Sequence, residues 1–281
     1  MRMKGKTIFN ASFDVFAETY HSVRPGYPAE LYADIKRLCD LDSASRLLEV
    51  GAGSGIATVE LAKFGSKIVA IEPGSHLTAI ARKQTEGLEN VEILEQTFES
   101  FESSDRFDAF LAFTSFHWLK GEDKYQKILQ LLADAGNLVL VWNYFFQTDS
   151  PVTAAVNRVY HELLPDVYPG QMDVRKVNEE VFSVLTRREQ RVTQNPLFYP
   201  AFMRRYLVEY NYNAETYPKF LNTFPKIVLV DEAKRLRFLK RISEVVADHG
   251  KISVPVFTSL IICKRKDYLL QAVADSRKER R

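Results

Sequence analysis

A glycine-rich segment near residue 50 has the residue types and the spacing of a ligand-binding turn. In 47-LLEVGAGSG-55 an apolar run leads into Gly51, Gly53 and Gly55, and an amphipathic stretch follows. Because glycine has no Cβ, such a turn can adopt positive φ and lets a ligand approach bare backbone. The segment therefore predicts a strand, a tight turn and a helix that bind a cofactor.

Charges around this turn indicate which cofactor it would take. The dinucleotide fingerprint requires a third glycine where Ile56 stands. Glu49, just before the turn, would repel a pyrophosphate, whereas it would attract the ammonium group of S-adenosylmethionine, which has no phosphate. Glu72 follows about 20 residues after the turn, the offset at which an acid accepts hydrogen bonds from ribose hydroxyls. These residues favour S-adenosylmethionine over a nicotinamide dinucleotide.

Short apolar runs alternate with amphipathic stretches in the first half of the chain, which predicts a parallel α/β sheet. The expected strands are residues 46–50, 67–71, 91–95, 107–113 and 137–142, followed later by 187–192 and 254–263. The expected helices are residues 12–20, 29–39, 56–64, 77–84 (with Ser75 as N-cap), 124–133, 153–163, 199–210 and 231–248. We expect an N-terminal helical lid over 1–45, a cofactor-binding core over 46–146, sheet completion with a helical substrate cap over 147–265, and a basic tail over 266–281.

The bulk composition is that of a globular protein. The 281 residues are 46% hydrophobic and 26% charged, with a net charge of +2, so disorder and a nucleic-acid partner are both disfavoured. Two cysteines far apart in the sequence indicate neither a disulfide framework nor a zinc cluster, and no metal site is expected. We expect no membrane span and a cytoplasmic location.

Several motifs together resemble the class I methyltransferases, and most closely their type 11 branch near trans-aconitate methyltransferase. Tyr20 with 24-RPGYP-28 is similar to the branch's N-terminal signature. The further matching segments are 49-EVGAGSG-55, 71-IEP-73, 97-TFES-100, 113-FTSFHWL-119 and 136-GNLVLVWN-143. Two positions depart from the family pattern: Thr97 stands where an acid is common, and Gly136-Asn137 replaces a Gly-Gly pair.

The resemblance implies a seven-stranded, doubly wound sheet with a helical cap and S-adenosylmethionine as cofactor, converted to S-adenosylhomocysteine. It also implies the residues that contact the cofactor. They are Tyr20, Arg24, Glu49, Gly51, Ala52, Gly53, Ser54, Gly55, Glu72, Pro73, Thr97, Phe98 and Thr114. Arg24 could instead clamp a carboxylate or hold the lid closed.

Methyl transfer from a sulfonium requires alignment of the acceptor and needs no metal. His117 is the base candidate, at the end of the fourth strand; alternatively, His117 and Trp118 simply form a wall beside the cofactor. Substrate contacts are expected from Trp118 and Asn143 and from an aromatic helix face. That face would comprise Tyr199, Phe202, Tyr206 and Tyr210, which could equally be packing.

The sequence thus favours a methyltransferase that acts on a small molecule. An RNA or protein methyltransferase is the main alternative, followed by a nicotinamide-dependent dehydrogenase and a cofactor-binding module without catalysis. The acceptor molecule, the acceptor atom and the oligomeric state are left open.

Overall fold

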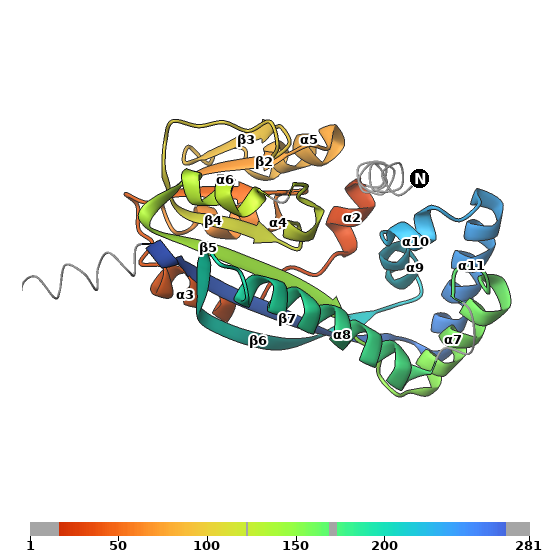
Figure 1. The fold of residues 1–281 in the computed structure, drawn as a ribbon. Helices are drawn as coiled ribbons and strands as arrows, with labels where there is room; N and C mark the ends of the chain where they lie inside the picture. Colours follow the sequence, from red (N-terminus) through yellow and green to blue (C-terminus); the bar gives the residue numbers. More distant parts are fainter. Residues whose placement is uncertain (1–16, 122, 169–172, 268–281) are drawn as a thin grey trace, which may run out of the picture. The chain divides into compact units, whose positions relative to one another are not determined.

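The chain divides into two compact units. The computed structural model describes residues 17–121, 123–168 and 173–267 (Figure 1). The sheet unit, as we call it, comprises Tyr27–Asn143, Thr186–Tyr206 and Thr258–Arg281. The helical unit comprises Met1–Gly26, Tyr144–Leu185 and Leu207–Phe257.

A seven-stranded sheet in the order β3-β2-β1-β4-β5-β7-β6 forms the centre of the sheet unit. The strands are β1 (Arg46–Val50), β2 (Lys67–Glu72), β3 (Val91–Glu95), β4 (Phe107–Phe113), β5 (Leu132–Phe145), β6 (Phe198–Tyr212) and β7 (Ile252–Arg265). The pairs from β3 through β5 are parallel. This confirms the predicted doubly wound fold, and β5, β6 and β7 each continue into the helical unit.

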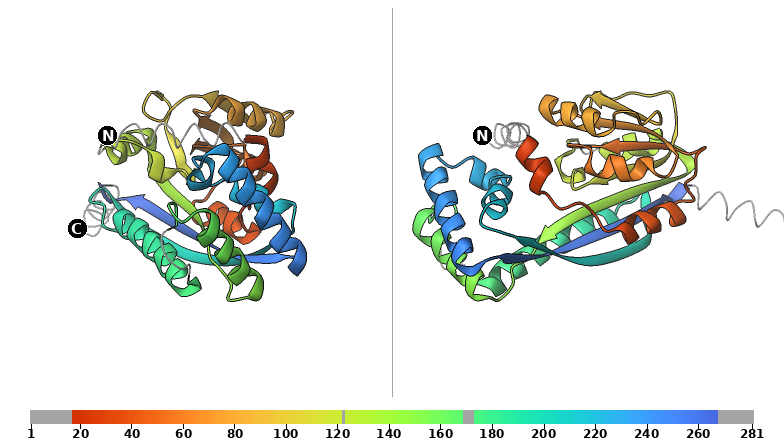
Figure 2. Two further views of the ribbon diagram at one scale, coloured as in Figure 1. Left: turned by 90° about the vertical axis from the view of Figure 1, so that its right-hand side faces the viewer. Right: turned by 180° about the vertical axis from the view of Figure 1, so that it is seen from behind.

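Helices cover the sheet and bury its apolar side chains. They are α3 (Ala29–Leu38), α4 (Ile56–Ala62), α5 (Ser75–Gln84) and α6 (Lys124–Leu131). The right-hand view of Figure 2 shows α3 and α4 in front of the strands. Leu31 of α3 and Leu61 of α4 join Leu47 and Leu111 of the sheet in one buried cluster. Helix α5 starts at Ser75, two residues before the expected Leu77, and its N-cap is Gly74 and not Ser75.

The helical unit has its own apolar core. Its helices are α2 (Ala17–Val23), α7 (Pro151–Leu163), α9 (Thr216–Leu221), α10 (Pro225–Val228) and α11 (Glu232–His249), while α8 (Val174–Thr193) spans both units. Asp231 caps α11 by accepting a hydrogen bond from the Lys234 N–H at 3.1 Å, and Gly250 at φ 80° ends it. Phe238 and Ile242 of α11 pack with Val156 of α7. The start of the predicted helix 12–20 lies outside the described residues.

The helix predicted over residues 199–210 is wrong, because this segment is strand β6 at the edge of the sheet. Phe202, Tyr206 and Tyr210 are spaced by four residues. That spacing places side chains on one face of a helix and also on one face of a strand, because four is a multiple of the strand period. Pro200 does not distinguish the two, since proline is tolerated both in the first turn of a helix and on an edge strand.

The strand predicted over residues 187–192 is also wrong, because these residues belong to helix α8. The buried positions of this segment are Leu185, Glu189 and Val192, which have helical spacing. The carboxylate of Glu189 is paired with Arg205 at Oε1 (3.1 Å) and Oε2 (2.5 Å) and accepts a hydrogen bond from Ser259 at 2.7 Å. A buried charge in the apolar pattern therefore concealed the helix from sequence reasoning.

Asp34 joins α3 to the edge strand within the sheet unit. Its carboxylate accepts hydrogen bonds from the Tyr206 hydroxyl at 2.7 Å, from Arg37 at 2.8 Å and from Arg204 at 2.9 Å. These hydrogen bonds, from Tyr206 first, lower the pKa of Asp34, against the opposing effect of burial. The ionised carboxylate thus stabilises the folded sheet unit.

Asp34→Asn is expected to lower the free energy of unfolding at pH 7 by about 1–3 kcal/mol, because the buried Tyr206 hydroxyl loses an ionised acceptor. Since the folded-state pKa is depressed, this contribution is lost as pH falls below about 4, and the two proteins should converge there. Urea unfolding at pH 7 and at pH 3 measures both differences. Arg37→Ala, which removes an exposed partner, should cost less than about 1 kcal/mol; a larger loss would mean that the pair with Arg37 dominates.

Candidate functional site

The neighbouring strands β1 and β4 mark the point where the strand order reverses. The chain runs from β1 outward to β3 on one side and from β4 onward on the other. In open α/β sheets, ligands bind outside the carboxyl ends of the strands at such a point. The glycine loop follows β1 there, and residues 114–118, which we call the wall segment, follow β4.

The glycines of the loop have three different surroundings, although all have positive φ, at 72° for Gly51, 59° for Gly53 and 84° for Gly55. A Cβ on Gly51 would lie 2.5 Å from the Cβ of Ser115, and one on Gly55 would lie 3.2 Å from the Cα of Ala81. A Cβ on Gly53 would meet nothing within 4 Å. Two glycines therefore allow close packing of the loop, and the middle one faces open space.

Glu49 belongs to β1, two residues before the glycine loop, and is fully buried, at 0% exposure. Its Oε2 accepts a hydrogen bond from the Thr58 hydroxyl at 2.7 Å, whereas its Oε1 has no hydrogen-bond partner among the described residues. Burial, followed by the charge of Glu72, raises the pKa of Glu49 to about 8 against the opposing hydrogen bond from Thr58. The Glu49 Oε1 atom is thus a buried acceptor without a donor in the described part of the chain, and a ligand group that carries a positive charge would fit it.

Glu72, at the end of β2, holds the loop in shape. Its Oε2 accepts a hydrogen bond from the Gly53 N–H and its Oε1 accepts one from the Gly74 N–H, both at 2.9 Å. Each carboxylate oxygen has two lone pairs, so hydroxyl donors such as those of a ribose could be accepted as well. Residues Ala52 and Ser54 are buried within the same turn, and Pro73 is exposed after it.

The wall segment begins at Thr114, which has φ 54°. The Ser115 hydroxyl donates to the Val50 carbonyl at 2.5 Å, which joins the wall to the end of β1. His117 and Trp118 form the 3-10 turn η1 (Phe116–Trp118), with their ring centroids 4.8 Å apart. Both predicted residues thus lie just past the carboxyl end of β4, in a segment whose Ser115 lies against Gly51.

Two further contacts reach this segment, and sequence reasoning missed one of them. The Tyr27 hydroxyl lies 3.1 Å from Thr114 Oγ1, and the Asn143 N–H donates to the same oxygen at 3.2 Å. Asn143 was expected near the substrate, and its Oδ1 accepts a hydrogen bond from Thr258 at 2.6 Å. Tyr27 belongs to the RPGYP motif, which was the available signal.

Thr97 and Phe98, expected beside the adenine, follow β3. Thr97 is exposed, and its hydroxyl lies 2.9 Å from that of Ser100. Phe98 is buried edge-on against Phe110, with centroids 5.5 Å apart. Only Thr97 therefore offers an accessible side chain at this position.

Tyr20 and Arg24 belong to the helical unit, where Arg24 has aromatic and polar partners. Its Nε donates to the Thr223 hydroxyl at 2.8 Å, and its guanidinium lies 4.3 Å from the ring centroid of Phe224 and 5.1 Å from that of Tyr20. Within this unit Arg24 joins α2 to the segment after α9. Its contact with a cofactor stays a prediction.

The aromatic residues expected on a helix face lie on β6, and their side chains differ in burial. Tyr206 is buried and bound to Asp34, Phe202 packs against the core of the sheet unit, and Tyr199 is half-buried. Tyr206 thus has a clear structural partner. A role in substrate binding stays a prediction for all three.

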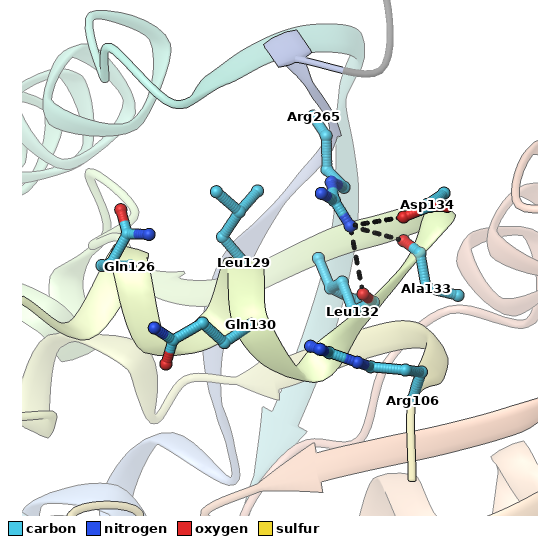
Figure 3. Close-up of a pocket in the computed structure, with 8 residues that line it drawn as sticks. All are labelled: Arg106, Gln126, Leu129, Gln130, Leu132, Ala133, Asp134 and Arg265. Carbon is cyan, nitrogen blue, oxygen red and sulfur yellow. Dashed lines mark hydrogen bonds and ion pairs between the residues drawn. The ribbon is translucent and has the colours of Figure 1, made fainter. Parts of the chain in front are cut away.

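A cavity of about 570 Å³ lies away from this site, where β5 begins and β7 ends (Figure 3). Its lining includes Arg265, whose guanidinium is bound to the carbonyls of Leu132 and Ala133 and to Asp134. The cavity therefore has a mixed polar and apolar lining, in which the carboxylate of Asp134 is paired with Arg265. No cluster of side chains suited to a metal ion occurs within the described ranges, and none of the helices described there is long and apolar enough to cross a bilayer.

Comparison with known proteins shows similarity to methyltransferases. Residues 47–136, about a third of the chain, match a family described as methyltransferase domain. A protein of Dictyostelium discoideum named as a methyltransferase is 28% identical over 166 residues, which is 58% of this chain and 61% of that protein. One of Mycobacterium tuberculosis, also named as a methyltransferase, is 30% identical over 47% of this chain and 52% of its own length. The chain thus spans about half to three-fifths of these relatives.

Among solved structures, a protein of Anaeromyxobacter dehalogenans named as a type II methyltransferase has the same fold. The two chains are 20% identical with a TM-score of 0.61, over 86% of this chain and 97% of the other. Residues 47–136, which match the methyltransferase domain family, contain the glycine loop, Glu72 and the wall segment. These residues therefore match a methyltransferase domain, and this chain shares the fold of that solved structure.

Proposed function

We propose that this protein transfers a methyl group from S-adenosylmethionine to a small-molecule acceptor by direct displacement. The observation that carries the proposal is the buried Glu49 carboxyl, which lies just before the glycine loop in the sequence and has one oxygen without a hydrogen-bond donor among the described residues. The methionine part of S-adenosylmethionine ends in an ammonium group, which would supply the missing donor. A dinucleotide would bring a diphosphate to the same place, where Glu49 would repel it.

In this proposal each residue of the site has a separate role. Glu49 and the glycine loop bind the amino-acid part, and Glu72 binds the ribose hydroxyls. S-adenosylmethionine supplies a methyl group already activated by positive sulfur, so the protein's task is mainly to align the acceptor. His117 accepts a proton where the acceptor atom carries one, and together with Trp118 it borders the acceptor's position.

The small-molecule acceptor rests on composition. The net charge is only +2, so the chain lacks the excess of positive charge typical of proteins that track a phosphate backbone. The helical unit, with its rings of Tyr20, Phe145, Phe220 and Phe224 around Arg24, could recognise an organic acid. A screen of metabolites with radiolabelled methyl donor would identify the acceptor.

The first test is ligand-induced stabilisation. S-adenosylmethionine and S-adenosylhomocysteine at about 100 times their dissociation constants should each raise the free energy of unfolding by about 2.7 kcal/mol. Thermal unfolding with each compound measures this effect, and NAD serves as the control ligand. Stabilisation by NAD, with none by either sulfur compound, would overturn the proposal.

A further inference from the structure

Thr114 has a backbone conformation that is costly for its residue type. Among the described residues, Thr114 at φ 54° and Asp40 at φ 53° are the non-glycine residues with positive φ. A β-branched side chain is especially disfavoured in this region. Such a conformation persists only where the surrounding structure over-determines it.

Three hydrogen bonds fix Thr114, and all of them lie within the sheet unit. Its N–H donates to the Val141 carbonyl at 2.7 Å, which continues the pairing of β4 with β5. Its Oγ1 accepts from the Asn143 N–H at 3.2 Å and lies 3.1 Å from the Tyr27 hydroxyl. Two of these bonds come from the adjacent strand, and only the one with Tyr27 comes from outside the sheet.

The Tyr27 ring is held in place by other aromatic rings. It packs edge-on against Phe113 at 4.9 Å and against Tyr32 at 6.5 Å between centroids. Because the ring is fixed, its hydroxyl reaches Thr114 with little loss of side-chain freedom. The Tyr27 hydroxyl therefore restricts the position of the Thr114 side chain.

The direction of the chain after Thr114 determines the place of the wall segment. Ser115 comes next, and its hydroxyl is bound to Val50 while its Cβ occupies the space that Gly51 leaves. His117 and Trp118 follow in the 3-10 turn. A change in the backbone at Thr114 would thus shift the wall segment relative to the glycine loop.

From these contacts we infer that Tyr27 is a positioning residue: its hydroxyl, through Thr114, sets the place of His117 and Trp118 relative to the glycine loop. This inference deepens the proposed function and rests on it for its catalytic meaning. The physical claim about the wall segment can be tested without any cofactor.

The test incorporates 5-fluorotryptophan, since the chain has only two tryptophans, Trp118 in the wall and Trp142 in β5. The ¹⁹F resonances are assigned with Trp118→Phe. Tyr27→Phe keeps the ring and removes the hydroxyl, and Thr114→Val keeps the branched shape and removes its partner. Each should shift the Trp118 resonance more than that of Trp142, whose ring packs against Phe116 at the start of the turn.

The matched control is Tyr32→Phe, which alters a ring of the same aromatic group without touching Thr114. It should leave both resonances in place. Thr114→Val also removes the acceptor of the Asn143 N–H. The double variant Tyr27→Phe, Thr114→Val should therefore give the shift of Thr114→Val alone and not the sum of the two single shifts, because the contact with Tyr27 is already lost in Thr114→Val. An unmoved Trp118 resonance in Tyr27→Phe, or additive shifts, would overturn the inference. Should Thr114→Val fail to fold, Thr114→Ala replaces it in the same comparison.

Calorimetry with S-adenosylmethionine then connects position to function. Tyr27→Phe and Thr114→Val should each raise the dissociation constant about fivefold, within the range of one hydrogen bond, and Tyr32→Phe should not. If the unaltered protein binds no S-adenosylmethionine, the proposed function fails, while the ¹⁹F shifts still decide whether Tyr27 positions the wall. If binding is tight and unchanged in Tyr27→Phe, the inference fails and the proposed function stands.

Discussion

Glu49→Gln is expected to weaken S-adenosylmethionine binding by roughly tenfold to a hundredfold. The buried carboxylate would form a charge-assisted hydrogen bond with the ammonium group, worth about 1.5–3 kcal/mol, and the amide cannot replace its charge. Titration calorimetry measures the dissociation constants. The control ligand is 5′-methylthioadenosine, which has the adenosine part and lacks the amino acid.

Binding of 5′-methylthioadenosine should change less than about twofold in this variant, because the lost contact concerns the ammonium alone. An equal loss for both ligands would mean that Glu49 shapes the loop and does not contact the amino-acid part.

The same variant has an opposite effect on the unliganded protein. Burial raises the pKa of Glu49 from 4.5 to about 8. The folded protein therefore retains a proton that the unfolded chain loses between these values. The free energy of unfolding should fall with rising pH in that window, by up to about 1.4 kcal/mol per pH unit, and Glu49→Gln should lack this slope. Thr58 and Glu72, the neighbours that oppose and reinforce the shift, are unchanged in the variant.

Gly53→Ala and Gly55→Ala are expected to separate binding from stability. At both positions positive φ costs an alanine about 1–2 kcal/mol. At Gly55 the new methyl group would also press on the backbone of Ala81 in α5, so this variant should be clearly the less stable one. At Gly53 the methyl group points into open space, and the fold should tolerate it.

Gly53→Ala should nevertheless weaken S-adenosylmethionine binding by about tenfold or more, a loss of at least about 1.4 kcal/mol, because the methyl group occupies the space of the ligand. Thermal unfolding without ligand and calorimetry with it give the two quantities. Unchanged affinity in a folded Gly53→Ala protein would move the cofactor away from this loop.

Much of the sheet unit follows from local sequence signals. Strands β1, β2 and β4 are mostly apolar, and the turn after β1 must be glycine because Gly51 and Gly55 lie against other atoms. The carboxyl end of β4 was identified as the place of His117 from strand polarity alone. Local patterns sufficed for β1, β2 and β4 because these strands are mostly buried on both faces, and for the edge strand β3 because its buried and exposed positions follow a short apolar segment.

The two wrong predictions, the helix over 199–210 and the strand over 187–192, fall where a helix and a strand would show the same sequence pattern. Edge strand β6 carries aromatic residues four apart, and helix α8 hides its period behind the buried Glu189, whose partner Arg205 is distant in sequence. Tyr27 was missed for a related reason: its hydrogen bond to Thr114 spans 87 residues, so no local spacing reveals it. Long-range polar partners are set by the fold and are invisible to periodicity.

The chain first passes from the helical unit to the sheet unit in the loop between Gly26 and Tyr27, and each later crossing lies within a helix or a strand. It leaves the sheet unit along β5 after Asn143, returns in α8 at Thr186, leaves again along β6 after Tyr206 and returns along β7 at Thr258. Most of the helical unit is thus two excursions between successive elements of an unchanged strand order. Such excursions can lengthen, shorten or change composition while the seven strands keep their pairing. Evolution could therefore diversify acceptor recognition in this architecture without rebuilding the donor-binding half.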